Sequence, residues 1–228
     1  MRRISAILIV LISAACWAAA AQFTLREIDQ DLSAIAPHAG ALPLRFASSA
    51  ERSSIERKLR RVIVVLDAAL LQTPNDPELL LRDAYANGMG HNFDYPDCAE
   101  KAISAYERYL AIRPDSKVGN YYYGSFLAGT ATLRDKSLVY LAKAANLGVS
   151  DAHYTAAMVY LSLNDKPRAL SELKEFQKAD PDNATANSLI KDLERGELTI
   201  RENHEAPPSD VVGQTPTPAT ETAPPTPK

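Results

Sequence analysis

The sequence predicts an all-α protein in which antiparallel helical hairpins stack as a short α-solenoid. Two observations support this fold class. Apolar residues recur at helical spacing between prolines, and one pattern with the spacing 0, 4, 7, 12 occurs three times. Its first three positions share one face of a helix, and the proline at the fourth ends that helix. The three copies are Val62, Leu66, Ala69, Pro74; Ala102, Tyr106, Tyr109, Pro114; and Ala169, Leu173, Phe176, Pro181.

The chain begins with a segment typical of a secretory signal peptide. Arg2 and Arg3 precede an apolar run from Ile4 to Ile12, and small residues follow up to Gln22. The run is shorter than the roughly 20 residues that a membrane-spanning helix needs. We therefore expect residues 1–21 to be a signal peptide cleaved after Ala21, which makes the protein periplasmic or secreted. An uncleaved membrane anchor is the alternative.

A lipid anchor is a second alternative at this end. The residues before Cys16 are small, as in bacterial lipoproteins, but Ser13 stands where that pattern has an apolar residue. Membrane association is thus expected only if the signal is uncleaved or Cys16 is acylated. Cleavage changes the formal net charge from −3 to −5 and leaves Cys98 as the only cysteine of the mature chain. An acidic chain argues against nucleic acid as a partner, and one cysteine forms no intramolecular disulfide.

The first helix is predicted within residues 22–43, which are assigned to an amphipathic helix and a linker. Thr24 and Glu27 form a capping box, and we expect this helix to cap the stack. A first, degenerate hairpin follows, with a short helix near Leu44–Arg52 and a long helix that starts at a second capping box, Ser53 with Glu56. The buried stripe of the first helix is predicted as Leu25, Ile28, Leu32 and Ile35.

The later hairpins show which family the chain resembles. Pro114 and Pro181 are 67 residues apart, nearly twice the 34-residue period of the tetratricopeptide repeat (TPR). A repeat without a proline should therefore end near Gly148. First helices of that family carry the spacing W-x2-L-G-x2-Y. The residues at those places are His153, Ala156, Ala157 and Tyr160 in the last repeat, and Asn120, Tyr123, Gly124 and Leu127 in the repeat before it. Ser137, Leu141 and Ala144 supply the buried face of the second helix in the repeat that lacks a proline.

Residues 44–196 thus resemble a TPR domain of about three to four repeats, which implies a right-handed solenoid. Ala157 and Gly124 are small enough to let the two helices of a hairpin approach closely. The second repeat matches less well. Its first-helix positions are Leu80, Asp83, Ala84 and Asn87, and about six residues are inserted between its helices in GMGHNFDYPD.

The C-terminal part is predicted as one helix and a tail. Ala184, Leu189, Ile190 and Leu193 form the apolar face of a capping helix that ends at Gly196. Residues 197–228 are a Pro/Thr-rich tail with too few large apolar residues to form a core, and we expect it to be disordered from about residue 205.

No motif in the sequence indicates catalysis: phosphate-binding loops, nucleophile elbows and zinc-ligand spacings do not occur. His91, Asp94, Asp97 and Cys98 could hold a metal, but Asp97 is also explained as the cap of the following helix. Cys98 is interpreted as a small packing residue, with a reactive thiolate or a link between two chains as the alternatives. The basic residues Arg57, Lys58, Arg60 and Arg61 are interpreted as a solvated face, with a site for an anionic partner as the alternative. We therefore expect no enzyme activity, no cofactor and no metal.

A binding groove is the remaining candidate. The resemblance implies that first helices line a concave surface, where tyrosine rings suit a peptide because they are rigid and amphipathic. Tyr123 is expected in the core, and for each ring on the surface packing alone is the alternative. The Lys and Asn pattern with which some relatives clamp a terminal carboxylate is absent. The positions that match the groove are Leu81, Tyr85, Tyr121, Tyr122, Tyr154 and Met158.

Taken together, the sequence predicts an exported TPR-like scaffold that mediates protein–protein interaction in a bacterial cell envelope, with a protein or peptide as its partner. The alternative is a lipid-anchored or structural accessory subunit of an envelope assembly or secretion complex.

Overall fold

The structure is a computed structural model that describes residues 24–198. The predicted signal peptide, Cys16 and the tail from residue 205 lie outside these residues. Within them the chain forms nine α-helices, one short 3-10 helix and no strand, so the predicted all-α class is confirmed. The helices are α2 (Leu25–Ala39), α3 (Ser49–Gln72), α4 (Pro77–Asn92), α5 (Cys98–Ile112), α6 (Lys117–Gly129), α7 (Arg134–Asn146), α8 (Asp151–Ser162), α9 (Lys166–Ala179) and α10 (Ala184–Arg195), with η1 (Ala131–Leu133) before α7.

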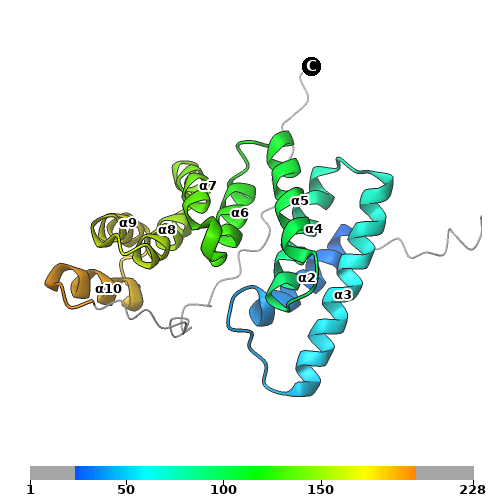
Figure 1. Ribbon diagram of the computed structural model, residues 1–228, viewed down its shortest axis with the longest axis horizontal. Helices are drawn as coiled ribbons and strands as arrows, with labels where there is room; N and C mark the ends of the chain where they lie inside the picture. The colour runs from blue at the N-terminus through cyan, green and yellow to red at the C-terminus, as the bar shows by residue number, and fades with distance from the viewer. Residues whose placement is uncertain (1–23, 199–228) are drawn as a thin grey trace, which may run out of the picture.

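Consecutive helices pack as pairs, and the pairs follow one another as a helical solenoid. Contacts join α2 with α3, α4 with α5, α6 with α7 and α8 with α9. The first helices of neighbouring pairs also touch, since α2 contacts α4, α4 contacts α6 and α6 contacts α8. Figure 1 shows this succession from α2 and α3 at one end to α9 and α10 at the other. None of the described helices is both long and apolar enough to cross a membrane.

The second helices use the predicted faces. Eight of the nine helical positions in the three spacing patterns are buried, and Ala69 is partly buried. Ser137, Leu141 and Ala144 on α7 are fully buried as predicted. Gly124 permits close approach within its hairpin, because a Cβ atom there would lie 2.8 Å from Leu141 Cγ.

Two of the turns between pairs, those before α6 and α10, share one hydrogen-bond arrangement. Asn120 on α6 donates from Nδ2 to the carbonyl oxygen of Pro114 at 3.0 Å, and Asn187 on α10 donates to that of Pro181 at 2.8 Å. Both asparagines occupy the first position of the first-helix pattern. Helix α10 therefore keeps the register of a first helix, and it is the last helix among the described residues.

The N-terminal prediction needs two corrections. The capping box of Thr24 and Glu27 is confirmed, and Ile28, Leu32 and Ile35 are buried, but Leu25 is 38% exposed. The expected helix near Leu44–Arg52 does not form as such, because α3 begins at Ser49 and Ser48 caps it by accepting from the Glu51 amide at 3.1 Å. The predicted capping box at Ser53 is wrong for the same reason. Helix α2 takes the place of the missing first helix, since it packs on α3 and α4.

The insertion in the second repeat also differs from the prediction. All of GMGHN, residues 88–92, belongs to α4, which has 16 residues where α6 has 13 and α8 has 12. The rest forms a short loop whose rings stack on the linker before α3. Phe93 lies between Phe46 and Tyr95, with ring centroids 5.8 and 5.6 Å away. Through these ring contacts the insertion packs the N-terminal linker against the second repeat.

Candidate functional site

The first helices α4 and α6 meet along a set of partly buried aromatic side chains. The rings of Tyr85 on α4 and Tyr122 on α6 stack with centroids 5.0 Å apart and planes 16° apart. Tyr121 adjoins Tyr122 at 6.0 Å. Leu81 is partly buried one helical turn before Tyr85. We call Leu81, Tyr85, Tyr121 and Tyr122 the tyrosine face.

The tyrosine face joins two repeats. Tyr123, the third tyrosine of the run, points the other way and is fully buried between Tyr106 and Tyr140, as expected. Its neighbours on the tyrosine face are each partly exposed. Because consecutive helix residues lie about 100° apart, α6 supplies both a core ring and surface rings from one short sequence.

The phenol groups of the tyrosine face remain protonated at physiological pH. Burial raises the pKa of Tyr85, Tyr121 and Tyr122, and the charge of Asp151 adds to the shift at Tyr121. The rings therefore offer neutral apolar surface together with hydroxyl groups that donate and accept hydrogen bonds.

Tyr154 and Met158, the other predicted groove residues, lie apart from this face. Both are partly buried on α8 and belong to the apolar cluster between α8, α9 and α10. The Tyr154 ring lies 5.2 Å from that of Phe176, and burial raises the pKa of its phenol. The structure thus brings four of the six predicted residues together, and it places Tyr154 and Met158 against the last hairpin.

Three residues that the sequence did not single out for the groove extend the tyrosine face. Phe126 follows Tyr122 by one helical turn, and its ring lies 5.9 Å from that of His91. A Cβ atom at Gly88 would lie 3.3 Å from the Phe126 ring, so this glycine lets α4 approach α6. The sequence could have indicated Phe126, because it follows Tyr122 at i, i+4 spacing and therefore lies on the same face of the helix.

Two polar residues of α4 are buried on the side of the helix that faces away from Tyr85. Asp83 is 5% exposed and Asn87 is fully buried, and both occupy first-helix pattern positions. Asn87 Nδ2 donates to the Asp83 backbone oxygen at 3.0 Å and to Asp83 Oδ1 at 2.9 Å. Burial raises the pKa of Asp83 to about 7, the charge of Asp67 adds to the shift, and Lys101 and Arg108 oppose it. The first-helix positions of the second repeat are therefore buried although they match the family pattern poorly; these residues are Leu80, Asp83, Ala84 and Asn87.

The residues weighed as a metal site are not gathered into one. Among residues 24–198, no group of three or more His, Cys, Asp and Glu side chains could hold a metal ion. Asp97 does not cap α5 with its side chain, because its backbone is left-handed, with φ 61°. Cys98 is buried, and this burial raises the pKa of its thiol, which disfavours a thiolate.

The basic residues of α3 are largely engaged within the protein. Lys58 and Arg61 both contact the carboxylate of Asp31 on α2. Arg60 pairs with Glu56 and lies 3.9 Å from the centroid of the Tyr95 ring. These contacts join α3 to α2 and to the inserted loop, while the side chains of Arg60 and Arg61 stay 58% and 54% exposed, as expected of a solvated face.

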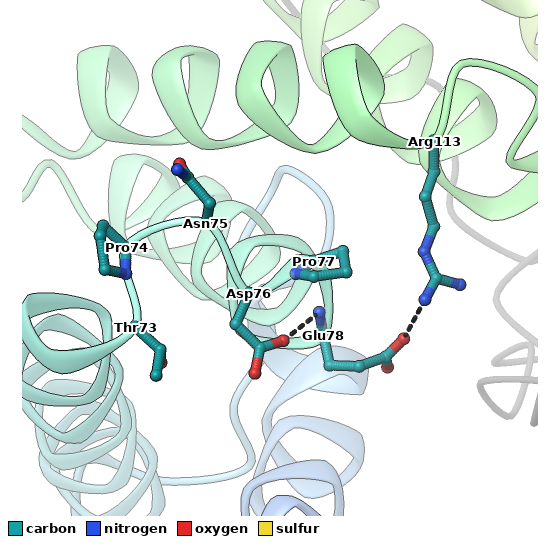
Figure 2. A pocket seen from close by; sticks show the side chains of 7 residues that line it. All are labelled: Thr73, Pro74, Asn75, Asp76, Pro77, Glu78 and Arg113. Atoms are coloured by element: carbon teal, nitrogen blue, oxygen red, sulfur yellow. Dashed lines mark hydrogen bonds and ion pairs between the residues drawn. The ribbon is translucent and has the colours of Figure 1, made fainter.

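A surface pocket lies at the turn between α3 and α4, away from the tyrosine face. Figure 2 shows Asp76 accepting from the Glu78 amide at 2.8 Å and Glu78 reaching Arg113 at 3.5 Å. These bonds cap α4 and tie one turn to the next. Its lining residues are Thr73, Pro74, Asn75, Asp76, Pro77, Glu78 and Arg113.

Comparison with known proteins identifies the fold. No family model and no curated protein sequence matches the chain. Two solved structures of MamA are similar, with TM-scores of 0.55 and 0.54, sequence identities of 18% and 16%, and coverage of 67% and 74% of this chain and 86% and 83% of theirs. TTC0263, a thermophilic TPR protein in Thermus thermophilus, has a TM-score of 0.51 at 15% identity over 82% of this chain and 96% of its own. The described residues therefore have a TPR-like fold.

Proposed function

We propose that this chain is an exported scaffold that binds a protein or peptide partner through the tyrosine face, with no catalysis of its own. The observation that carries the proposal is the stack of Tyr85 and Tyr122 across two first helices, where both rings pack against the core and stay partly exposed. A TPR-like solenoid offers such a surface continuously along its first helices.

The composition of the face supports binding. Tyrosines lose little conformational entropy on binding and combine apolar area with a hydroxyl group, so they are common interface anchors. Tyr85 and Tyr122 are held by each other before a partner arrives, which lowers the ordering cost further. Truncating one such anchor typically costs about 2 kcal/mol of binding free energy.

Affinity capture from an envelope extract of the source cells tests this proposal. The bait is the wild-type chain, a Tyr85→Ser/Tyr122→Ser variant or a Tyr160→Ser control. Tyr160 is also partly buried, but it lies under the Arg168 guanidinium on the last hairpin. We expect the double variant to lose captured proteins that the wild type and the control retain, with helix content unchanged by circular dichroism. Equal capture by all three baits would refute the assignment to this face.

The export part of the proposal rests on the order of charge, apolar run and small residues in the first 22 positions. We expect mass spectrometry of the mature protein to find an N-terminus at Gln22. A lipidated Cys16, detected by radioactive palmitate labelling that a Cys16→Ser variant abolishes, would instead support the accessory subunit on a lipid anchor. An intact Met1 would contradict both processing routes.

A further inference from the structure

We propose that the proline-rich tail of this same chain docks on the tyrosine face and competes there with the partner. This inference rests on the proposed function, because it assigns an internal competitor to the same surface. It depends on three observations: the chemistry of the face, the composition of the tail and the distance between them.

The first observation concerns the face. It presents stacked neutral rings with hydroxyl groups, and Phe126 continues it along α6. Surfaces of this kind recognise polyproline II segments, whose proline rings lie against aromatic rings and whose free carbonyl groups accept hydrogen bonds. Such a ligand is already extended, so it loses little entropy on binding.

The second observation concerns the tail. Residues 215–227 read TPTPATETAPPTP, and Glu221 is their only charged residue. Prolines at alternating or adjacent positions favour polyproline II, and threonine is compatible with it. A nearly neutral segment also suits a face made of neutral rings. The ligand class that the face would recognise therefore occurs within the chain itself.

The third observation concerns reach. The described chain ends on the last hairpin, where Lys166 Nζ donates to the Leu198 carbonyl oxygen at 2.7 Å. Helices packed side by side are about 8–10 Å apart, so α6 lies roughly 20 Å from α10 across α8. Thr215 follows Leu198 by 17 positions. A chain of that length spans roughly 20–25 Å on average, which matches the distance to α6, the nearer of the two helices that carry the tyrosine face.

The agreement between the span of the tether and the distance to the face determines how strongly the tail competes with a partner. A tether whose average span equals the distance between the sites gives a local concentration on the order of 1 mM. A contact of only millimolar intrinsic affinity is then populated within one molecule. A partner must displace the tail, which lowers its apparent affinity by the occupied fraction.

Photo-crosslinking within the full chain tests the proposal without any partner. Thr217 is replaced by benzoylphenylalanine, the chain is irradiated, and crosslinked peptides are identified by mass spectrometry. We expect crosslinks within one chain to peptides from residues 77–92 and 117–129. Their yield should fall about five- to tenfold in the Tyr85→Ser/Tyr122→Ser background and in a Pro216→Ser/Pro218→Ser tail, and stay unchanged with Tyr160→Ser.

Other outcomes would overturn the inference. Crosslinks spread over α3, α5 and α7, or crosslinks only between two chains, would show that the tail does not dock on its own tyrosine face. The proposed function would survive that result, because the capture experiment measures the partner directly. Conversely, specific crosslinks together with a failed capture would leave the tail as the ligand of the face and refute the partner.

Discussion

The buried carboxyl group of Asp83 makes a specific prediction for how stability depends on pH. Asp83 is 5% exposed, and its Oδ1 accepts only the Asn87 amide among the hydrogen bonds described above. Burial raises its pKa to about 7, whereas an unfolded aspartate titrates near 3.9. Between about pH 4 and pH 7 the folded chain therefore binds a proton that the unfolded chain has lost. This contribution to stability is complete below pH 4 and is lost as the pH rises through 7.

The size of the effect follows from the separation of the two pKa values. Each pH unit is worth 1.36 kcal/mol, so a separation of about 3 units amounts to about 4 kcal/mol. The substitution Asp83→Asn removes the titration and keeps an acceptor for the Asn87 amide. The variant should match the parent near pH 4 and exceed its free energy of unfolding by about 4 kcal/mol at pH 8 and above.

Urea unfolding followed by circular dichroism at intervals from pH 4 to pH 8.5 measures this difference. The exposed residue Asp135 supplies a control, since Asp135→Asn should change the free energy of unfolding by less than about 0.5 kcal/mol at each pH. A difference between Asp83→Asn and the parent that stays constant with pH, or that shrinks as the pH rises, would refute the reasoning.

Three further predictions concern packing, each measured by denaturant unfolding. Gly124→Ala places a methyl group 2.8 Å from a leucine side chain of α7 and should lower the free energy of unfolding by about 1–3 kcal/mol. Gly129→Ala meets nothing within 4 Å and should leave that free energy unchanged or raise it slightly. Equal effects of the two substitutions would contradict the close approach of α6 and α7. Tyr154→Ala removes a ring that packs on a phenylalanine of α9 and should lower the free energy of unfolding by at least about 1 kcal/mol. A smaller loss would mean that the ring contributes little to packing and is available for binding. Arg82→Met removes the bidentate partner of Asp29 between α4 and α2 and should lower the free energy of unfolding by about 1–3 kcal/mol. An unchanged unfolding midpoint would contradict this prediction.

The sequence predicted the fold where periodicity and stop signals agree. The three spacing patterns ending in proline placed α3, α5 and α9 and most of their buried residues. The prediction failed where local chemistry was ambiguous. Ser48 with Glu51 and Ser53 with Glu56 both resemble cap pairs, and the helix begins at the first of them, with Ser48 as its cap. Asp97 is a suitable cap residue by type, but its left-handed backbone turns the side chain away from the amide groups.

The candidate site was predictable only in part for a related reason. Helical spacing placed Tyr85 and Tyr122 on first helices, yet their mutual stacking depends on how closely α4 and α6 approach, as they do where Gly88 meets Phe126. Tyr154 has the same place in its repeat as Tyr121, but it packs on Phe176 of the next helix. A position in a repeat thus predicts the direction of a side chain more reliably than what that side chain meets.

Exposed apolar side chains also occur on the second helices, and they offer the partner a binding surface other than the tyrosine face. Val64 and Leu71 on α3 are 65% and 82% exposed, and Val139 on α7 is 67% exposed. If the partner binds on that side, these residues become covered and the tyrosine face stays open.

Hydrogen exchange of the chain with and without its captured partner tests the central claim most directly. We predict that binding slows exchange in peptides from residues 77–92 and 117–129, which carry the tyrosine face, and leaves residues 49–72 and 134–146 unchanged. Protection confined to the latter two helices would contradict the account, because it would place the partner on the second helices.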